Sequence, residues 1–244
     1  MELVFSSLEF EQEVRKQLNI FDRAITTQDA QEVSELDLST LSFRDEDNET
    51  LFCFENLKVL ALCSGSRDAF FWDHFLKMED LSWECRDSEV DFMVFSKMHN
   101  LTSLWVSGGD YSNIKLNNLS ALISLQKLDS LYFHEFGRVD LAPLGAMIQL
   151  KTLAVLYSYE VKNIATIGTM TQLEYLELTG LLVEDLNFLD MLPDSVELDM
   201  CGIEIYGSKN VDVKKWKRFV KRNISEIEVK DPYWKFADLS VLDE

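Results

Sequence analysis

Hydrophobic residues recur along most of this chain in one six-residue phrase, L-x-x-L-x-L. The fourth residues of its nine copies are Leu36, Leu60, Leu81, Leu104, Leu131, Leu153, Leu176, Val196 and Ile227. Seven of the eight steps between them are 20 to 27 residues long. The alternation of apolar and polar residues that ends each phrase has the period of a β-strand. We therefore expect about nine short strands at a nearly constant spacing.

A second apolar pattern, with a step of three residues, occupies segments between the phrases. Its four sets are Phe92, Phe95, Met98 and Leu101; Leu116, Leu119, Leu122 and Leu125; Ile164, Ile167, Met170 and Leu173; and Val183, Leu186, Leu189 and Leu192. A three-residue period places residues i and i+3 on one face of a 3-10 turn or short helix. One strand with its return cannot bury its apolar face alone, so the units must stack and share a core.

The segment before the first phrase carries the most specific match to a known family. Phe10, Val14 and Leu18 mark one face of a short helix, and Thr26 or Thr27 is a candidate N-cap in the segment 25–38. With the phrases, this segment resembles the bacterial leucine-rich-repeat family, especially its internalin-like branch, over about residues 10 to 208. The resemblance implies an α/β leucine-rich-repeat solenoid with about nine parallel strands on its concave face. Short helical or 3-10 returns would form the convex face, behind a helical N-terminal cap.

We expect one continuous domain with three parts: an N-terminal helical cap over residues 1–32, repeats over 33–208, and the last repeat with a C-terminal cap over 209–244. In one respect the chain departs from the family. An asparagine usually stands three residues past the last leucine of each phrase, but those places hold Leu41, Gly65, Arg86, Gly109, Phe136, Ser158, Leu181 and Cys201. We therefore expect degenerate repeats, an irregular superhelix, and Cys201 in the core.

The C-terminal part contains the longest step. It holds Val213, Trp216, Phe219 and Val220 at helical spacing, which predicts a helix over 211–222. Residues 209–222 hold seven Lys or Arg and one Asp, so the other face of this helix is basic. A solvated cap helix on an acidic body is one interpretation, and a docking patch for an acidic partner or anionic lipid is the other. Tyr233, Trp234 and Phe236 are expected to cover the open end of the core.

Charge and composition narrow the classes of partner. The net charge of −20 should repel nucleic acid and anionic membranes and attract basic proteins. The longest apolar run is far short of the roughly 20 residues that a membrane span needs. The N-terminus holds Glu2 and Glu9 and no early Lys or Arg, which argues against a secretory signal. We therefore expect a cytoplasmic protein, or a secreted one if a leader is missing. We also expect a monomer. The four cysteines form no C-x-x-C pair, and reduced thiols are expected.

Candidate binding residues are the outward-facing positions of the strands, because side chains alternate between the two faces of a sheet. The aromatic candidates are Trp105, Tyr132, His134, Tyr157 and Tyr175, and the acidic ones around them are Asp37, Asp80, Glu84, Glu177, Glu197 and Asp199. Aromatic anchors within a charged surround are typical of protein-binding hot spots. The alternative is that aromatic residues are simply favoured in strands and pack on one another.

The sequence holds no recognisable pattern of catalytic or metal-binding residues. His74, His99 and His134 lie far apart without metal-ligand spacing. The acidic segment 45–49 lacks the glycine and glutamate positions of a calcium loop. We therefore expect no catalytic residues, no metal and no cofactor, and a protein that is not an enzyme.

Three hypotheses for function remain. The first is a non-enzymatic module that binds a basic protein on an acidic concave face with an aromatic centre. The second is an immunity or inhibitor protein that neutralises a basic toxin or nuclease, by analogy with other acidic proteins. The third is a structural or surface-display fragment of a larger secreted protein.

Overall fold

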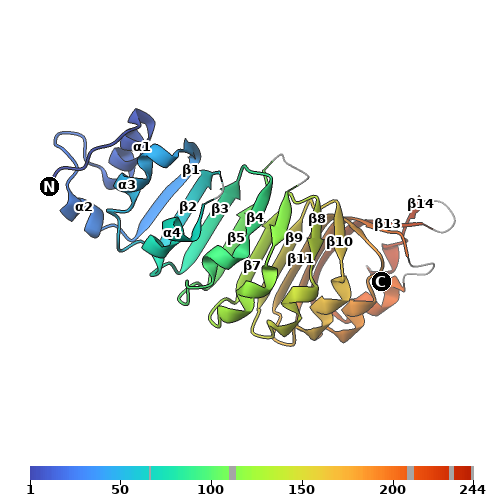
Figure 1. Cartoon of the computed structure of the whole chain (residues 1–244). Helices are drawn as coiled ribbons and strands as arrows, with labels where there is room; N and C mark the ends of the chain where they lie inside the picture. The colour runs from blue at the N-terminus through green and yellow to red at the C-terminus, as the bar shows by residue number, and fades with distance from the viewer. Residues whose placement is uncertain (66, 110–113, 208–211, 231–233, 243–244) are drawn as a thin grey trace.

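The computed structural model describes residues 1–65, 67–109, 114–207, 212–230 and 234–242. Its main feature is an elongated sheet with short returns packed along one face (Figure 1). Ten described strands form it, in the order β1-β2-β3-β5-β7-β9-β11-β12-β13-β14. Nine of them run parallel, and β14 pairs antiparallel with β13. The expected solenoid of about nine parallel strands is confirmed.

The strands from β2 to β9 in this sheet are five or six residues long, whereas β1 and β11 to β13 are nine or ten residues long. They are β1 (Glu35–Phe43), β2 (Val59–Ser64), β3 (Asp80–Cys85), β5 (Ser103–Ser107), β7 (Ser130–His134), β9 (Thr152–Leu156), β11 (Tyr175–Val183), β12 (Glu197–Ile205), β13 (Lys221–Lys230) and β14 (Trp234–Phe236). Two further sheets of two parallel strands lie beside it. They are β4 (Glu89–Asp91) with β6 (Lys115–Asn117), and β8 (Arg138–Asp140) with β10 (Glu160–Lys162).

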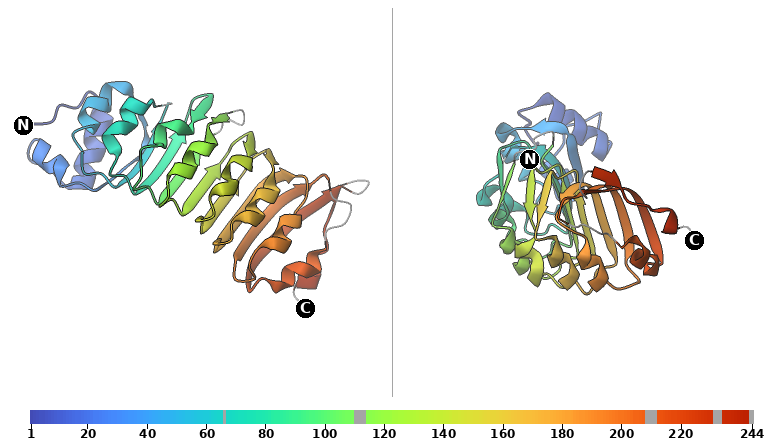
Figure 2. Two further views of the ribbon diagram at one scale, coloured as in Figure 1. Left: turned by 60° about the horizontal axis from the view of Figure 1, so that its bottom comes forward. Right: turned by 90° about the vertical axis from the view of Figure 1, so that its right-hand side faces the viewer.

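Among the described residues, the α-helices lie within the first 72 positions, and the later returns are 3-10 helices. The α-helices are α1 (Leu8–Leu18), α2 (Thr27–Gln31), α3 (Asn48–Leu51) and α4 (Ala69–Trp72). The 3-10 helices are η1 (Asp45–Asp47), η2 (Asp73–Phe75), η3 (Phe92–Phe95), η4 (Leu119–Ser124), η5 (Ala142–Ala146), η6 (Ile164–Thr169), η7 (Asn187–Met191), η8 (Val213–Arg218) and η9 (Ser240–Leu242). The returns lie side by side along the length of the molecule (Figure 2). The expected helical or 3-10 returns are thus present.

The N-terminal helices close the first edge of the sheet. Ser7 caps α1, since its Oγ accepts a hydrogen bond from the N–H of Phe10 at 3.2 Å. Thr26, and not Thr27, is the N-cap of α2, in a capping box with Asp29. From α1, the Gln17 amide accepts from the N–H of Asp37 at 2.9 Å and donates to its carbonyl at 2.5 Å. The amide therefore satisfies backbone groups on the open side of β1.

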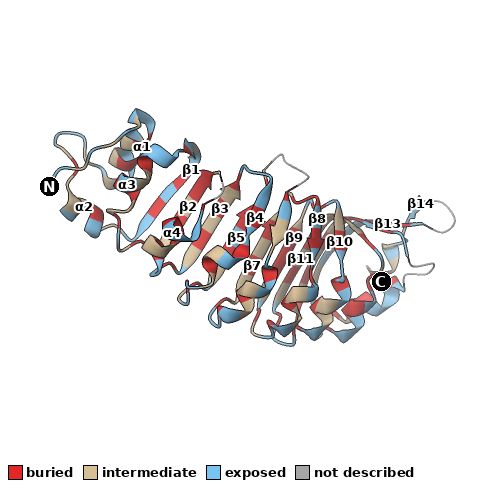
Figure 3. Cartoon of the chain, in the orientation of Figure 1, coloured by how far each residue is buried: buried red, intermediate tan, exposed pale blue. Residues whose placement is uncertain are grey.

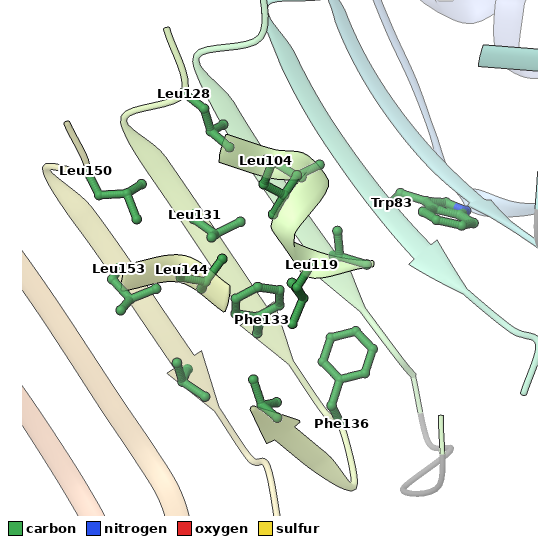
Figure 4. Packing of buried hydrophobic residues seen from close by; sticks show 14 of the residues in the cluster. Trp83, Leu104, Leu119, Leu128, Leu131, Phe133, Phe136, Leu144, Leu150 and Leu153 are labelled. Atoms are coloured by element: carbon green, nitrogen blue, oxygen red, sulfur yellow. The ribbon is translucent and has the colours of Figure 1, made fainter. Parts of the chain in front are cut away.

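One continuous core runs from the N-terminal helix to the tail. The inward leucines of the strands meet the residues of the returns, as Leu104, Leu131 and Leu153 do with Leu119 and Leu144 in Figure 4. Buried and more exposed residues alternate along the strands (Figure 3). Burial of this apolar surface stabilises each repeat only through its neighbours.

The sequence prediction was wrong about the register of the last two copies. Leu198 pairs with Leu176, so Leu198 and not Val196 is the fourth residue of its phrase, and Val196 precedes the strand. Leu198 in turn pairs with Arg222, five residues before Ile227. Positions 36, 60, 81, 104, 131, 153, 176, 198 and 222 then give steps of 24, 21, 23, 27, 22, 23, 22 and 24 residues. The error arose because buried residues at a two-residue period fit several registers equally well.

The same correction changes the interpretation of Cys201. It pairs with Thr179 and is only partly buried, while Ile203 takes the place beside Leu181. The expected core role of Cys201 is therefore wrong. In β11 and β12 one residue interrupts the alternation of inward and outward side chains. Gly180 and Gly202 lie at this point, and each has a positive φ angle of 63°.

The expected helix over 211–222 is also corrected. A single 3-10 helix, η8, covers Val213–Arg218, and β13 begins at Lys221; residue 211 lies outside the described part. Val213, Trp216 and Phe219 are buried, whereas Val220 is 81% exposed. The burial thus follows a three-residue period, which is the period of a 3-10 helix.

The C-terminal segment 234–242 covers the end of the core, but with other residues than we expected. Leu242 is buried, and Ala237, Leu239 and Val241 pack against the core. Phe236, which we expected to cover the core, is 67% exposed. Tyr233 lies outside the described residues, as does the side chain of Trp234.

Asparagines do connect the repeats, but at a different place from the family pattern. The Asp91 and Asp140 carboxylates each accept the N–H two residues on, at 2.9 and 3.0 Å, where a 3-10 return begins. In the following repeats Asn118 and Asn163, with φ of 57° and 56°, donate to those carboxylates at 2.8 and 2.7 Å. These contacts tie consecutive returns together.

Candidate functional site

The face of the main sheet that points away from the returns, here called the open sheet face, carries the candidate residues. Parallel pairing aligns equivalent positions of consecutive strands into columns. One column runs Asp37, Ala61, Ser82, Trp105, Tyr132, Ala154, Glu177, Asp199 and Asn223. The column before it includes Asp80, Tyr175 and Glu197, and the column after it includes Glu84 and His134.

Four rings form a group at the centre of this face, which we call the aromatic group: Trp105, Tyr132, His134 and Tyr157. Trp105 and Tyr132 are neighbours on adjacent strands. The ring of His134 lies between those of Trp105 and Tyr157. Its centroid is 5.8 Å from that of Trp105 and 5.6 Å from that of Tyr157, and both contacts are edge-to-face. Trp105 is 41% exposed and Tyr157 is 58% exposed, so the group presents apolar surface to solvent.

His134 is held in place by polar neighbours as well as rings. Its Nδ1 lies 3.2 Å from the Ser107 hydroxyl and 3.6 Å from a Glu135 carboxylate oxygen.

The position of the Tyr157 ring is set by the backbone. Its φ of 51° turns the chain at the end of β9, and its ring lies over Gly180 of the next repeat. A Cβ atom on Gly180 would stand 2.9 Å from Cδ1 of Tyr157, so only glycine leaves room for the ring.

Acidic residues border the aromatic group on its N-terminal side. Burial and the nearby Asp80 carboxylate raise the pKa of the half-buried Tyr132 phenol. Burial also raises the pKa of Asp80. The Glu84 carboxylate accepts from the Cys63 thiol at 3.2 Å and from Arg86 Nε at 3.1 Å. Burial and the hydrogen bond to Glu84 raise the pKa of Cys63 to about 11, so this thiol is protonated at neutral pH.

A second acidic group lies on the C-terminal side of the aromatic group: Tyr175, Glu177, Glu197 and Asp199. The Tyr175 hydroxyl donates to Glu177 at 3.2 Å. Burial, with Glu177, Asp199 and Glu197 nearby, raises the pKa of Tyr175 to about 12. Lys221 Nζ pairs with Glu197 at 2.9 Å, and Asn223 Nδ2 donates to Asp199 at 3.3 Å. Three carboxylates thus face one ammonium, which leaves a negative potential there.

Asp37 is the one candidate that the structure leaves apart. It stands three strands from Trp105 in the same column, about 14 Å away at the usual strand spacing. Its carboxylate accepts from the N–H and hydroxyl of Ser39. The corrected register also sets the outward positions of the last parallel strand, where Lys221 and Asn223 pair with Glu197 and Asp199.

Within the described ranges, no group of three or more His, Cys, Asp or Glu side chains is placed to hold a metal ion. No helix in the described part of the chain has both the length and the apolar character to cross a membrane. The acidic segment 45–49 forms η1 and the start of α3, and the Asp47 carboxylate accepts from the N–H of Ser7 at 3.0 Å. Cys53, Cys63, Cys85 and Cys201 form no disulfide.

Repeated strand–return units around one core, with one parallel sheet face left open, define a leucine-rich-repeat solenoid. Solved structures of this class are similar over most of the chain. Internalin C2 of Listeria monocytogenes aligns with a TM-score of 0.67 and 14% identity, over 93% of this chain and 95% of that one. An internalin of the same organism, inlF, aligns with a TM-score of 0.57 and 20% identity, over 98% of this chain and 66% of that one.

A plant peptide hormone receptor, RGFR1, in complex with RGF2, also aligns. The TM-score is 0.53 at 15% identity, over 80% of this chain and 36% of the receptor chain. No family model matches the chain, and no curated protein matches its sequence. The similarity to internalins confirms the expected leucine-rich-repeat fold. At these identities it speaks to the fold alone.

Proposed function

We propose that this protein is a binding module that holds a basic partner protein on its open sheet face. The observation that carries the proposal is the aromatic group, flanked by carboxylates on both sides. Exposed aromatic rings that are fixed by neighbours bind with little loss of side-chain entropy, and acidic surroundings favour basic partners. The structure of the similar plant peptide hormone receptor in complex with RGF2 supports a binding role for this fold.

The size of the face suits a folded partner. Nine parallel strands at about 4.8 Å spacing span roughly 40 Å, the scale of a standard protein interface. The acidic residues would steer a basic partner to the face and set its orientation, and the rings would supply the buried contact. Inhibition of a basic toxin or nuclease is a special case of the same proposal.

A capture experiment tests the proposal. The full chain is immobilised and exposed to a lysate of the source organism in about 0.15 M salt, where charges interact over about 8 Å. We expect a basic protein to be retained and to be released at high salt. Replacing Trp105 and Tyr157 with Ala should weaken its binding at least tenfold, since both rings are exposed and their loss leaves the core intact.

The control is Phe70→Ala, which removes an exposed aromatic ring from α4, on the side of the returns. It should leave binding unchanged. If the captured proteins are acidic, or bind the Trp105→Ala/Tyr157→Ala variant as well as the native chain, the open sheet face is not the binding surface.

A further inference from the structure

A groove lies on the flank of the solenoid, where the two small sheets fail to join. β6 pairs with β4 and β8 pairs with β10, but β6 and β8 belong to separate sheets. Two adjoining cavities of about 800 and 540 Å³ lie there, and both are lined by Leu116 and Arg138. The break falls in the longest repeat, which has 27 residues from Leu104 to its partner Leu131. We call this feature the flank groove.

Basic side chains gather at the flank groove of a strongly acidic chain. Among the described residues that line it, Lys115, Arg138 and Lys162 are basic and Asp140 is acidic. The Asp140 carboxylate accepts from the N–H of Ala142 at 3.0 Å and from the Asn163 amide at 2.7 Å. The net charge of the whole chain is −20, so this excess of basic lining residues is local.

One carboxylate serves two of the three basic residues. Arg138 Nε lies 3.0 Å and Lys162 Nζ 3.9 Å from the carboxylate of Glu160, so two cations share one anion. Lys115 makes no ion pair or side-chain hydrogen bond with the other residues that the structure describes. A cation that pairs with none of the described residues is available to an external carboxylate.

The remaining lining residues suit a peptide. Ile114 and Val139 are buried in the walls, and Tyr159 stands exposed at the rim. The groove follows two parallel strands that do not pair with each other, so its walls present strand edges. A groove that combines strand edges, an apolar wall and cations suits an extended chain.

We propose that the flank groove binds an extended acidic segment of a partner protein. Carboxylates of the segment contact Lys115 and Arg138, and an apolar side chain packs against Leu116 and Tyr159. The site is separate from the open sheet face and selects the opposite charge. It therefore stands or falls independently of the function proposed above.

Selection from a displayed library of random octapeptides against the full chain, in about 0.15 M salt, tests this proposal. We expect the enriched peptides to be acidic. Arg138→Gln, Arg138→Glu and Lys115→Glu should each weaken their binding at least tenfold, with circular dichroism confirming that each variant is folded. Lys214→Glu is the matched control, since it makes the same charge change at an exposed position in η8 and should leave binding unchanged.

Amide chemical shifts then locate the bound peptide. Titration with an enriched peptide should move the signals of β6 and β8 and leave those of β5 and β7 in place. The proposal is overturned if no peptide is enriched, if the enriched peptides are basic, or if binding is lost with Trp105→Ala and kept with Arg138→Gln. The last result would assign the peptides to the open sheet face, so failure of this proposal is distinguishable from failure of the proposed function.

Discussion

Tyr157 has a left-handed backbone although it is not a glycine, with φ of 51°. This conformation costs a residue with a Cβ atom on the order of 1–2 kcal/mol. The equivalent positions of the next two repeats are Gly180 and Gly202, which adopt the same conformation without that cost. Glu135 and Glu226, at the equivalent positions of the repeats before and after these three, also have positive φ angles of 60° and 54°. The left-handed turn therefore recurs in five consecutive repeats, and at Tyr157 it also places an aromatic ring on the open sheet face.

Gly180 and Gly202 provide a matched pair of variants. Gly180→Ala and Gly202→Ala should each lower the free energy of unfolding by about 1–2 kcal/mol, because both add a Cβ at a φ of 63°. Only at Gly180 does the added Cβ stand 2.9 Å from the Tyr157 ring, whereas at Gly202 the nearest atom is 3.6 Å away. Urea unfolding measures the first effect, and contacts between the Tyr157 and His134 rings in NMR spectra measure the second. Equal loss of ring contacts in both variants would contradict this account.

At the scale of the residue, the sequence predicted part of the candidate site. Trp105, Tyr132 and His134 were placed together because their strands are in the correct register from the leucines alone. The contact of Tyr157 with His134 was missed, since it depends on a backbone turn that the strand period does not encode. Whether these residues bind a partner stays a prediction.

At the scale of the element, the junction between strand and return is the most regular feature. Asp91 and Asp140 end their strands, accept the N–H of the return, and bind an asparagine of the next repeat. Aspartates that accept nearby N–H groups begin 3-10 and α-helical turns for the same reason that they cap helices. This aspartate or asparagine before an apolar residue was a usable signal, and it would have marked the correct register of the last repeats.

The pair Asp140 and Asn163 tests how strongly consecutive returns are coupled. Asp140→Ala should lower the free energy of unfolding by about 1–2 kcal/mol, because it removes a cap and a link to the next repeat. With Asn163→Ala, a double-mutant cycle in urea should give a coupling of at least about 0.5 kcal/mol. Asn187→Ala, an exposed position in η7, serves as a partner with which Asp140→Ala should show no coupling. Additive effects for Asp140 and Asn163 would mean that the 2.7 Å contact contributes nothing.

The prediction of a helix over 211–222 failed at this same scale. Val213, Trp216, Phe219 and Val220 fit a helical pattern, but only the first three are buried. In a short segment the patterns of a 3-10 helix and an α-helix differ by one residue, and the available space between strands selects the tighter form.

At the scale of the whole molecule, the apolar core is continuous and the charge is divided. The core runs unbroken from Phe10 to Leu242, so each repeat depends on both neighbours. Acidic groups flank the aromatic group on the open sheet face, whereas basic residues line the flank groove. The partners proposed for the two surfaces therefore differ in charge.

A central core variant tests the dependence between repeats. Leu153→Ala should lower the free energy of unfolding by about 2–5 kcal/mol, because Leu153 is fully buried between two repeats. The native chain should unfold in a single transition that is the same by tryptophan fluorescence and by circular dichroism. Ile148→Ala, at a site that is 57% exposed, should change the free energy by less than about 0.5 kcal/mol. A cost below 1 kcal/mol for Leu153→Ala would contradict the shared core.

The spacing of apolar residues was sufficient to predict the repeat, a 3-10 or short helical return and the outward positions of seven strands, whereas the parallel arrangement came from the family resemblance. It could do so because burial of an apolar face imposes a period of two on strands and of three on 3-10 returns. The tertiary structure decided the register of β12 and β13, the turn at Tyr157 and the break between β6 and β8. These features depend on which of several equally apolar registers pairs with its neighbour, and on how much chain each repeat must fit beside the next. No local period carries that information.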